Sequence, residues 1–122
     1  MTARVLLVDD DDASRLTLGA LLEDEGMTVV EASSEEEAKS ALADGPPFHL
    51  ALLDLHLGDV LGTVLVADVA ASSKSTRILV LSGDPPDREV AGIHGWIVKG
   101  DDYARTLAVI SEQVSHATSA AE

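Results

Sequence analysis

The chain has 122 residues, a net charge of −14 and no cysteine. This length suits one domain with a substantial core, and the lack of cysteine excludes disulfides, thiolate metal sites and a cysteine nucleophile. The negative charge argues against binding nucleic acid or an anionic membrane through a basic patch. No basic leader and no apolar stretch long enough to span a bilayer is visible, so we expect a soluble cytoplasmic protein.

Strand-like apolar runs alternate with helical patterns from the start of the chain. Val5–Val8 is expected to be a strand buried on both faces, and Ala13–Glu25 a helix with apolar residues at helical spacing. Asp11 or Asp12 is the expected N-cap of this helix, and Gly26 stands just past its end. These features predict a first strand–helix unit.

The next stretch repeats the pattern. Met27–Ala32 is expected to form a strand, and Ser34–Glu37 is a capping box that opens a second helix. The Gly45–Pro47 turn ends that helix, and Leu50–Leu53 is a third strand that leads directly into Asp54. A carboxylate beside such apolar neighbours is costly unless it is paired or bound to a metal.

The second half continues in the same way after a loop that contains two glycines. The expected elements are a helix over Thr63–Ala71, a strand over Ile78–Leu81, a short helix over Pro86–Ala91, a strand over Trp96–Val98, a helix over Asp102–Val114 and a frayed tail over Ser115–Glu122. Nearly continuous apolar strands that alternate with helices predict an α/β fold, with a parallel sheet covered by helices on both faces.

Parallel sheets of this type bind ligands beyond the carboxyl ends of their strands. Polar residues follow the expected strands at that edge: Asp9, Asp10, Asp54, Ser82 and Lys99. Each has an ordinary explanation on its own, as a strand-ending polar residue, a turn former or a solvated charge. Their coincidence at one edge predicts a site. Two carboxylates about 4 Å apart repel by roughly 4 kcal/mol near a protein surface, so the adjacent pair of aspartates favours a bound cation.

Four segments, in order along the chain, resemble the receiver domains of two-component response regulators. They are LLVDDD, LLDLHLGD, ILVLSG and GWIVKG, at residues 6–11, 52–59, 78–83 and 95–100. The resemblance covers essentially the whole chain. It implies a single receiver domain over residues 1–122 with a flavodoxin-like, doubly wound five-stranded parallel sheet, strand order 2-1-3-4-5, and here a shortened fourth helix.

The resemblance also implies a Mg²⁺ site. Asp9 and Asp10 match the acidic pair of the family, with Asp10 the expected direct ligand and Asp9 acting through water. Asp54 and the backbone carbonyl of His56 would complete the protein ligands. Mg²⁺ prefers carboxylates and waters and shares the oxygens of a phosphate, which suits this set of residues.

The same resemblance assigns phosphoryl chemistry to the site. Asp54 would be the phosphoacceptor and would form an acyl phosphate. Ser82 would donate a hydrogen bond to the phosphoryl group, and Lys99 would pair with one of its oxygens. Trp96 matches the aromatic switch position, with a plain strand aromatic as the alternative. The implied phosphodonor is a histidine kinase or histidine phosphotransfer protein, and the implied output is to a downstream protein target or effector domain, without enzymatic turnover of a separate substrate.

Several residues depart from the family pattern. Gly100 follows Lys99 where the family usually has a proline, so we expect a trans peptide there. Gly58 also replaces a common proline, and the Gly83–Gly95 segment is short. Two alternatives remain: a pseudo-receiver that binds partners without phosphorylation, and a Mg²⁺-dependent phosphohydrolase, for which His56 stands where a second acid is expected. The chain is either a single-domain regulator or part of a longer protein.

Overall fold

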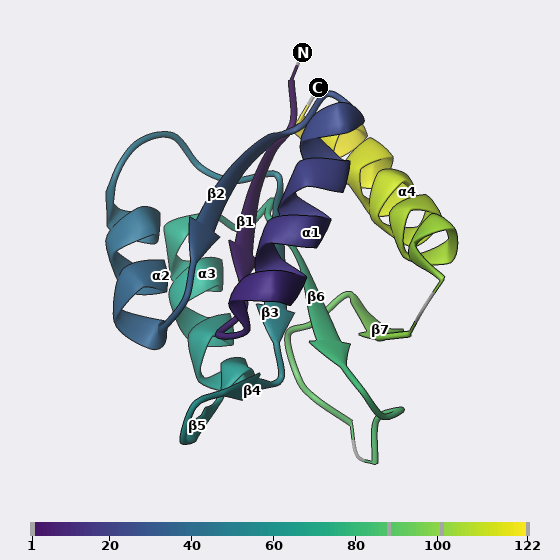
Figure 1. Ribbon diagram of the computed structural model, residues 1–122. Helices are drawn as coiled ribbons and strands as arrows, with labels where there is room; N and C mark the ends of the chain where they lie inside the picture. Colours follow the sequence, from purple (N-terminus) through teal and green to yellow (C-terminus); the bar gives the residue numbers. More distant parts are fainter. Residues whose placement is uncertain (1, 88, 101, 122) are drawn as a thin grey trace.

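The core of the protein is a five-stranded parallel sheet. The computed structural model describes residues 2–87, 89–100 and 102–121, of which 116–121 are described by their backbone alone. The strands are ordered β2-β1-β3-β6-β7, so β3 is central and β7 is an edge strand (Figure 1). Their bounds are β1 Arg4–Val8, β2 Thr28–Ala32, β3 Leu50–Asp54, β6 Arg77–Ser82 and β7 Gly95–Val98. This confirms the predicted order 2-1-3-4-5, in which β6 and β7 are the fourth and fifth strands.

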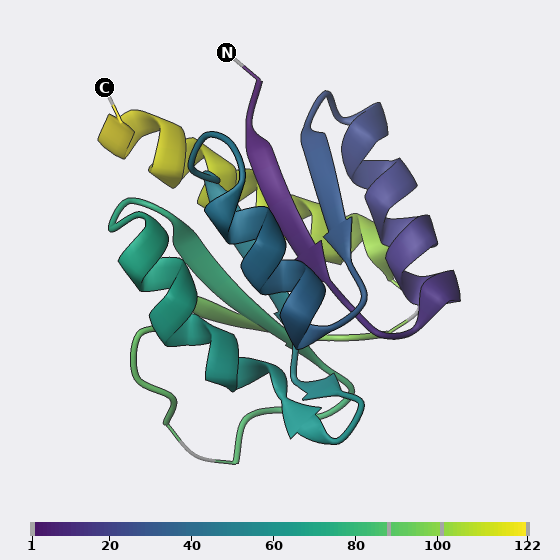
Figure 2. The same ribbon diagram turned by 90° about the vertical axis from the view of Figure 1, so that its left-hand side faces the viewer.

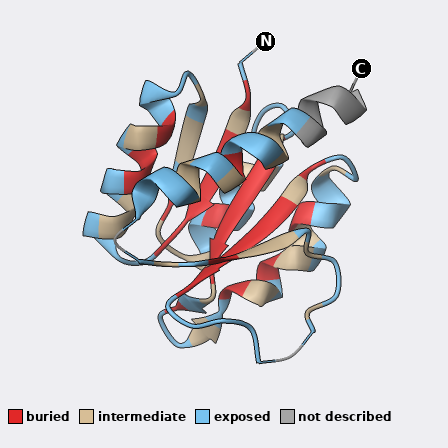
Figure 3. Ribbon diagram, turned by 90° about the vertical axis from the view of Figure 1, so that its right-hand side faces the viewer, coloured by how far each residue is buried: buried red, intermediate tan, exposed pale blue. Residues whose placement is uncertain are grey.

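Helices cover both faces of the sheet, as its continuous apolar strands require. Helices α1 (Asp12–Asp24) and α4 (Tyr103–Ala121) pack on one face, and α2 (Glu35–Ala43) and α3 (Val66–Ser72) pack side by side on the other (Figures 1 and 2). Successive strand residues alternate between the two faces. The inner strands β1, β3 and β6 are therefore almost wholly buried, whereas the edge strands β2 and β7 and the outer faces of the helices are partly exposed (Figure 3).

Local sequence signals fix the ends of the first two helices. Asp11 is the N-cap of α1, since its carboxylate accepts the backbone N–H of Ser14 at 2.9 Å. Ser34 caps α2 by accepting the N–H of Glu37 at 3.2 Å. Gly26 lies just past α1 with φ +92°, a conformation that favours glycine. The predicted caps are confirmed.

The segment before the edge strand differs from its prediction. The short helix expected over 86–91 is absent from the described residues of that range, which carry no helix, and Arg88 lies outside the described residues. Pro85 and Pro86 disfavour helical backbone at Asp84 and Pro85, which affects the approach to this range but not the residues after Pro86. Gly92, with φ +84°, then turns the chain into β7. This side of the sheet edge therefore has a loop where a helix was expected.

The remaining differences are smaller. The loop after β3 contains a two-stranded antiparallel hairpin, β4 (His56–Leu57) and β5 (Val60–Leu61), followed by a 3₁₀ turn over Gly62–Leu65. The final helix does not end near Val114, because no glycine or proline interrupts the sequence, and it continues to Ala121. The backbone is thus helical through Ala121, the expected fraying of the tail stays a prediction, and Glu122 lies outside the described residues. Within the described residues, no helix has both the length and the apolar character needed to cross a bilayer.

Candidate functional site

Polar side chains gather at the carboxyl edge of the sheet, where the sequence predicted them. The described residues include four buried polar or charged residues, and three of them lie here: Asp9, Asp54 and Ser82, which are 2%, 7% and 3% exposed as whole residues. Asp9 follows β1, Asp54 ends β3 and Ser82 ends β6. Burying such groups is costly unless they are paired, so this edge requires local compensation.

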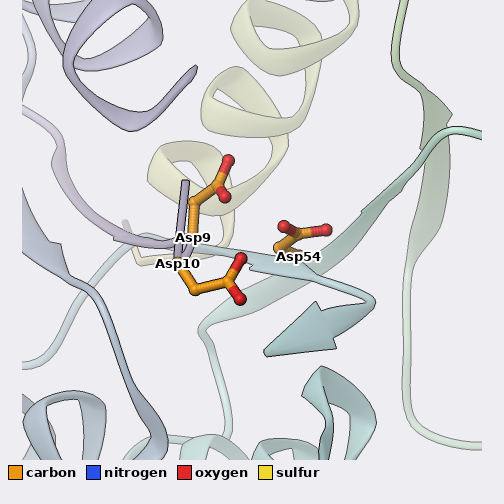
Figure 4. Close-up of side chains that lie close together, drawn as sticks. All are labelled: Asp9, Asp10 and Asp54. Carbon is orange, nitrogen blue, oxygen red and sulfur yellow. The ribbon is translucent and has the colours of Figure 1, made fainter. Parts of the chain in front are cut away.

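Three carboxylates form the centre of this cluster. Asp9, Asp10 and Asp54 each offer one oxygen, and these oxygens lie within 4.8 Å of one another. Figure 4 shows the three side chains meeting from the ends of β1 and β3. An octahedral Mg²⁺ holds its ligands at about 2.1 Å, which places neighbouring ligands about 3–4 Å apart. The carboxylates therefore fit a divalent cation after only small side-chain shifts.

Lys99 partly compensates the negative charge. Its Nζ lies 3.1 Å from Asp9 Oδ2 and 3.2 Å from Asp54 Oδ2. Its backbone N–H donates to the Ser82 carbonyl at 2.6 Å, which ties the residue to the end of β6. Burial disfavours the ammonium, but Asp54 and Asp9 outweigh that effect and raise the pKa of Lys99. The described peptide bonds are trans, as expected at Gly100, and Lys99 reaches the carboxylates in that geometry.

Asp54 has the most perturbed acidity in the site. Burial raises the pKa of Asp54 to about 6, and Asp9 adds to the effect, whereas Lys99 acts against it. Near neutral pH the side chain is therefore mainly a carboxylate held at an energetic cost. A positive ion beside it would favour the charged form and relieve that cost.

Asp10 is the exposed member of the cluster. Its Oδ2 accepts the backbone N–H of Gly58 at 2.7 Å, so the hairpin that follows β3 contacts it directly. Gly58 has φ +61° and supplies an N–H that a proline at this position would lack. The departure from the family pattern thus adds a hydrogen bond to a candidate ligand.

Ser82 and Trp96 are joined through the turn after β6. The backbone N–H of Asp84 donates to Ser82 Oγ at 3.2 Å, and the indole Nε1 of Trp96 donates to the Asp84 carbonyl at 3.0 Å. Trp96 is only half-buried. Because both bonds involve the backbone of one residue, a movement of the turn at Asp84 would affect Ser82 and Trp96 together.

His56 lies in β4 with an exposed side chain. Its side chain is not part of the metal-ligand cluster found among the described residues. The role predicted for it concerns its backbone carbonyl, and this role stays a prediction.

Two contributors to the site were missed in the sequence. At Gly62 an added Cβ would lie 1.9 Å from the carbonyl oxygen of Asp54, so only glycine fits beside that strand end. Arg15 donates from Nη1 to the carbonyl of Asp9 at 2.8 Å. The sequence signal for Gly62 was its position in the loop after Asp54, whereas Arg15 looked like an ordinary helix residue.

Comparison with known proteins places this architecture in a family. The family model of the response regulator receiver domain matches residues 5–110. The transcriptional regulatory protein AruR of Pseudomonas aeruginosa is 36% identical over 107 residues, which cover 84% of this chain and 43% of AruR. The cell cycle transcriptional regulator CtrA of Caulobacter vibrioides is 32% identical, over 95% of this chain and 54% of CtrA. The chain thus spans about half the length of these relatives.

Solved structures give the same result. A CheY-like response regulator receiver domain protein from Methanospirillum hungatei has a TM-score of 0.87 and 26% identity, with 98% of each chain covered. A response regulator protein from Burkholderia pseudomallei, with a phosphorylated aspartic acid, a calcium ion and citrate, has a TM-score of 0.77 and 26% identity, covering 96% of this chain and 71% of that chain. Receiver domains are signalling domains of two-component systems. By its sequence and its fold, the chain belongs to the response regulator receiver domain family.

Proposed function

We propose that this receiver domain is phosphorylated on Asp54 in a Mg²⁺-dependent reaction, in the cytoplasm, by a histidine kinase or histidine phosphotransfer protein. The observation that carries the proposal is the position of Asp54. Its carboxylate lies beside those of Asp9 and Asp10 and 3.2 Å from the Lys99 ammonium, which also pairs with Asp9. An anionic phosphoryl group needs such positive charge and positioning more than it needs covalent catalysis.

Asp9, Asp10, Asp54 and the His56 carbonyl would hold the ion. When bound, Mg²⁺ supplies positive charge that neutralises the incoming phosphoryl oxygens. The close approach of the three carboxylates supports this assignment, as does the pKa of Asp54, which burial raises to about 6.

The transfer itself would occur at Asp54. One carboxylate oxygen attacks phosphorus, and the bond from phosphorus to the donor nitrogen or oxygen breaks, with its electron pair leaving on the donor. Lys99 would shift from its ion pair with Asp54 to a phosphoryl oxygen. Ser82 Oγ would donate a hydrogen bond to another oxygen. The product is an acyl phosphate on Asp54.

Signalling would follow from the added charge. A phosphoryl group brings about −1.5 to −2 charges and strong acceptors, which draw Ser82 Oγ inward. The turn at Asp84 would then move with it and release or re-aim Trp96, because Asp84 contacts both side chains. The change biases an existing two-state equilibrium toward a form that a downstream protein target or effector domain recognises. We propose no binding of nucleic acid or membrane by this domain.

The experiment treats the protein with Mg²⁺ and acetyl phosphate and measures the intact mass. We expect addition of one phosphoryl group to the wild type and none to Asp54→Asn, and loss of the adduct when Mg²⁺ is chelated. Beryllium fluoride with Mg²⁺ should also change the emission of Trp96, the single tryptophan. If the fluoride response persists in Asp54→Asn, Asp54 is not the acceptor.

One observation favours the pseudo-receiver as a second candidate. The described residues of 86–91 form no helix, which alters a region that the family uses for output. A pseudo-receiver would show no phosphoryl adduct on the wild type under the conditions above. The same experiment therefore separates the two functions.

A further inference from the structure

The guanidinium of Arg15 contacts three parts of the chain beside the acidic site. Its Nη1 donates to the Asp9 carbonyl at 2.8 Å, its Nε to Glu31 at 3.1 Å and its Nη2 to Asp12 at 2.7 Å. The side chain is only 13% exposed. Because the guanidinium is planar and all three of its nitrogens are engaged, its orientation is fixed.

The contact with Asp9 completes the bonding of that residue. The N–H of Asp9 donates to Ala32 at 3.0 Å, its Oδ1 accepts from Asp11 at 3.0 Å and its Oδ2 accepts from Lys99 at 3.1 Å. The carbonyl is the remaining polar group, and Arg15 is its partner. Each polar group of Asp9 is therefore held from a different direction.

The Asp9 carbonyl also restrains the backbone of the next residue. This carbonyl and the nitrogen of Asp10 belong to one planar peptide unit. Holding the carbonyl therefore restrains that plane, which also contains the Cα of Asp10, and so restrains the point at which the Asp10 side chain leaves the backbone. Arg15 contacts neither Asp10 nor Asp54 through any bond described above, so its effect on the carboxylate cluster passes through this peptide.

The support for Arg15 comes from the neighbouring strand as well as from its own helix. Glu31 is in β2, and its side chain is 33% exposed, whereas that of Asp12 is 79% exposed. Gly19, one turn after Arg15 in α1, leaves space for Glu31, because a Cβ there would lie 3.3 Å from Glu31 Oε2. Glu31 is thus the better shielded partner and the one that orients the guanidinium.

We propose that Arg15 is a positioning residue for cation binding: it holds the Asp9–Asp10 peptide so that Asp10 presents its carboxylate to the ion. The inference rests on the proposed function, because it concerns the same site. It makes a prediction opposite to that of simple electrostatics. Removing a positive charge near a cation site should strengthen cation binding, whereas removing a positioning residue should weaken it.

The first experiment measures the Mg²⁺ dissociation constant by titration of the metal-free protein. We expect Mg²⁺ to bind about tenfold more weakly to Arg15→Gln and to Arg15→Lys, as when other residues that orient metal ligands are replaced. Arg15→Lys keeps the positive charge but lacks the planar guanidinium with its several N–H donors. Lys39→Gln is the matched control, since Lys39 is a cation on α2 that pairs with Glu35 at 2.9 Å, apart from the carboxylate cluster. Its affinity should stay within twofold of the wild type. Unchanged or tighter binding by Arg15→Gln overturns the proposal.

A second experiment requires no cation. The N–H of Gly58 donates to Asp10 Oδ2 at 2.7 Å, so its hydrogen exchange, measured by NMR in chelator, reports whether Asp10 keeps its direction. Exchange at Gly58 should accelerate in Arg15→Lys and in Glu31→Gln, while Val80 in the centre of β6 keeps its rate. Glu35→Gln carries the same charge change as Glu31→Gln and should leave both amides unaltered. Equal acceleration at Gly58 and Val80, or none at Gly58, overturns the proposal.

The two experiments separate the possible failures. If the wild type shows no Mg²⁺ binding, the proposed function fails, and the exchange of Gly58 still decides whether Arg15 orients Asp10. If the wild type binds Mg²⁺ and the Arg15 variants bind it equally well, the proposed function stands and the role assigned to Arg15 is wrong.

Discussion

The ammonium of Lys99 lies 3.2 Å from the carboxylate of Asp54, although Lys99 follows β7 and Asp54 ends β3, with β6 between these two strands. The side chain of Lys99 crosses the end of β6 to make this contact. It places a positive charge beside the carboxylate that would accept the phosphoryl group. Lys99 therefore competes with a cation for the carboxylates but would assist an incoming phosphoryl group.

Replacing Lys99 should separate these two effects. In Lys99→Met we expect Mg²⁺ to bind about tenfold more tightly, because a like charge worth about 1–2 kcal/mol at water-like dielectric is removed. Phosphorylation by acetyl phosphate should be slower by about a hundredfold, as when one stabilising donor is lost. Titration and the rate of mass gain measure the two. Lys39→Met, on α2, should change neither the Mg²⁺ affinity nor the phosphorylation rate. Weaker Mg²⁺ binding by Lys99→Met would contradict the prediction.

Replacing Asp54 should stabilise the metal-free protein in a pH-dependent way. The pKa of Asp54 is raised from an ordinary 3.8 to about 6 on folding, so the protonated side chain favours the folded state and this contribution is lost as pH rises through 6. Asp54→Asn avoids that loss. We expect it to increase the free energy of unfolding by about 1–3 kcal/mol at pH 7.5, and by about half as much at pH 5. Urea unfolding in chelator measures both, and a gain that grows toward pH 5 would contradict the sign.

Adding Mg²⁺ should stabilise the wild type through the carboxylate cluster. At a hundred times the dissociation constant, binding to the folded state alone contributes about 2.7 kcal/mol, which raises Tm by about 8–12 °C in a domain of this size. Asp10→Asn should lose most of that increase. Asp59→Asn, an exposed carboxylate in the hairpin outside the cluster, should keep it. An equal loss in both variants would indicate non-specific screening of the negative charge.

Adding one methyl group at Gly62 should disrupt the site. The Cβ of Gly62→Ala would lie 1.9 Å from the Asp54 carbonyl, so backbone must move, and we expect a destabilisation of about 3–5 kcal/mol. Gly83→Ala is the control, because no atom lies within 4 Å of its added Cβ, and its stability should change by less than about 1 kcal/mol. Thermal unfolding of both variants gives the comparison. A stable Gly62→Ala protein would show that the strand end and the following turn are freer than the structure indicates.

Much of the architecture was predictable because burial dictates sequence most strongly in a central parallel sheet. Apolar runs such as Leu50–Leu53 have no other plausible location, and the polar residues that follow them must meet at one edge. The meeting of Asp9, Asp10 and Asp54 follows from that rule, and the structure confirms it. The strand order was implied by the resemblance to the receiver family, and a cap at Asp11 or Asp12 by the preference of helix N-termini for aspartate; the structure confirms both, with Asp11 as the cap. The chemical roles assigned to these residues stay predictions.

The features that were missed depend on contacts that no local pattern records. The role of Gly62 depends on the approach of a carbonyl from another segment, and that of Arg15 on partners in the turn after β1 and in β2. The helix expected over 86–91 was inferred from the alternation of strands and helices along the chain, whereas the described residues of that range form none. Sequence patterns therefore located the site but not the residues that hold it in shape.

The placement of the acceptor on β3 has one more consequence. This strand is hydrogen-bonded on both sides, to β1 and to β6, whereas β7 has a neighbour on one side only. The residue that would take the phosphoryl group therefore stands where the backbone is least able to yield, and Trp96 and Lys99 stand at the margin, where opening costs less. A conformational change caused by phosphorylation at the central strand should therefore be largest at the edge strand β7. Differences between the phosphorylated and unphosphorylated forms should be sought there.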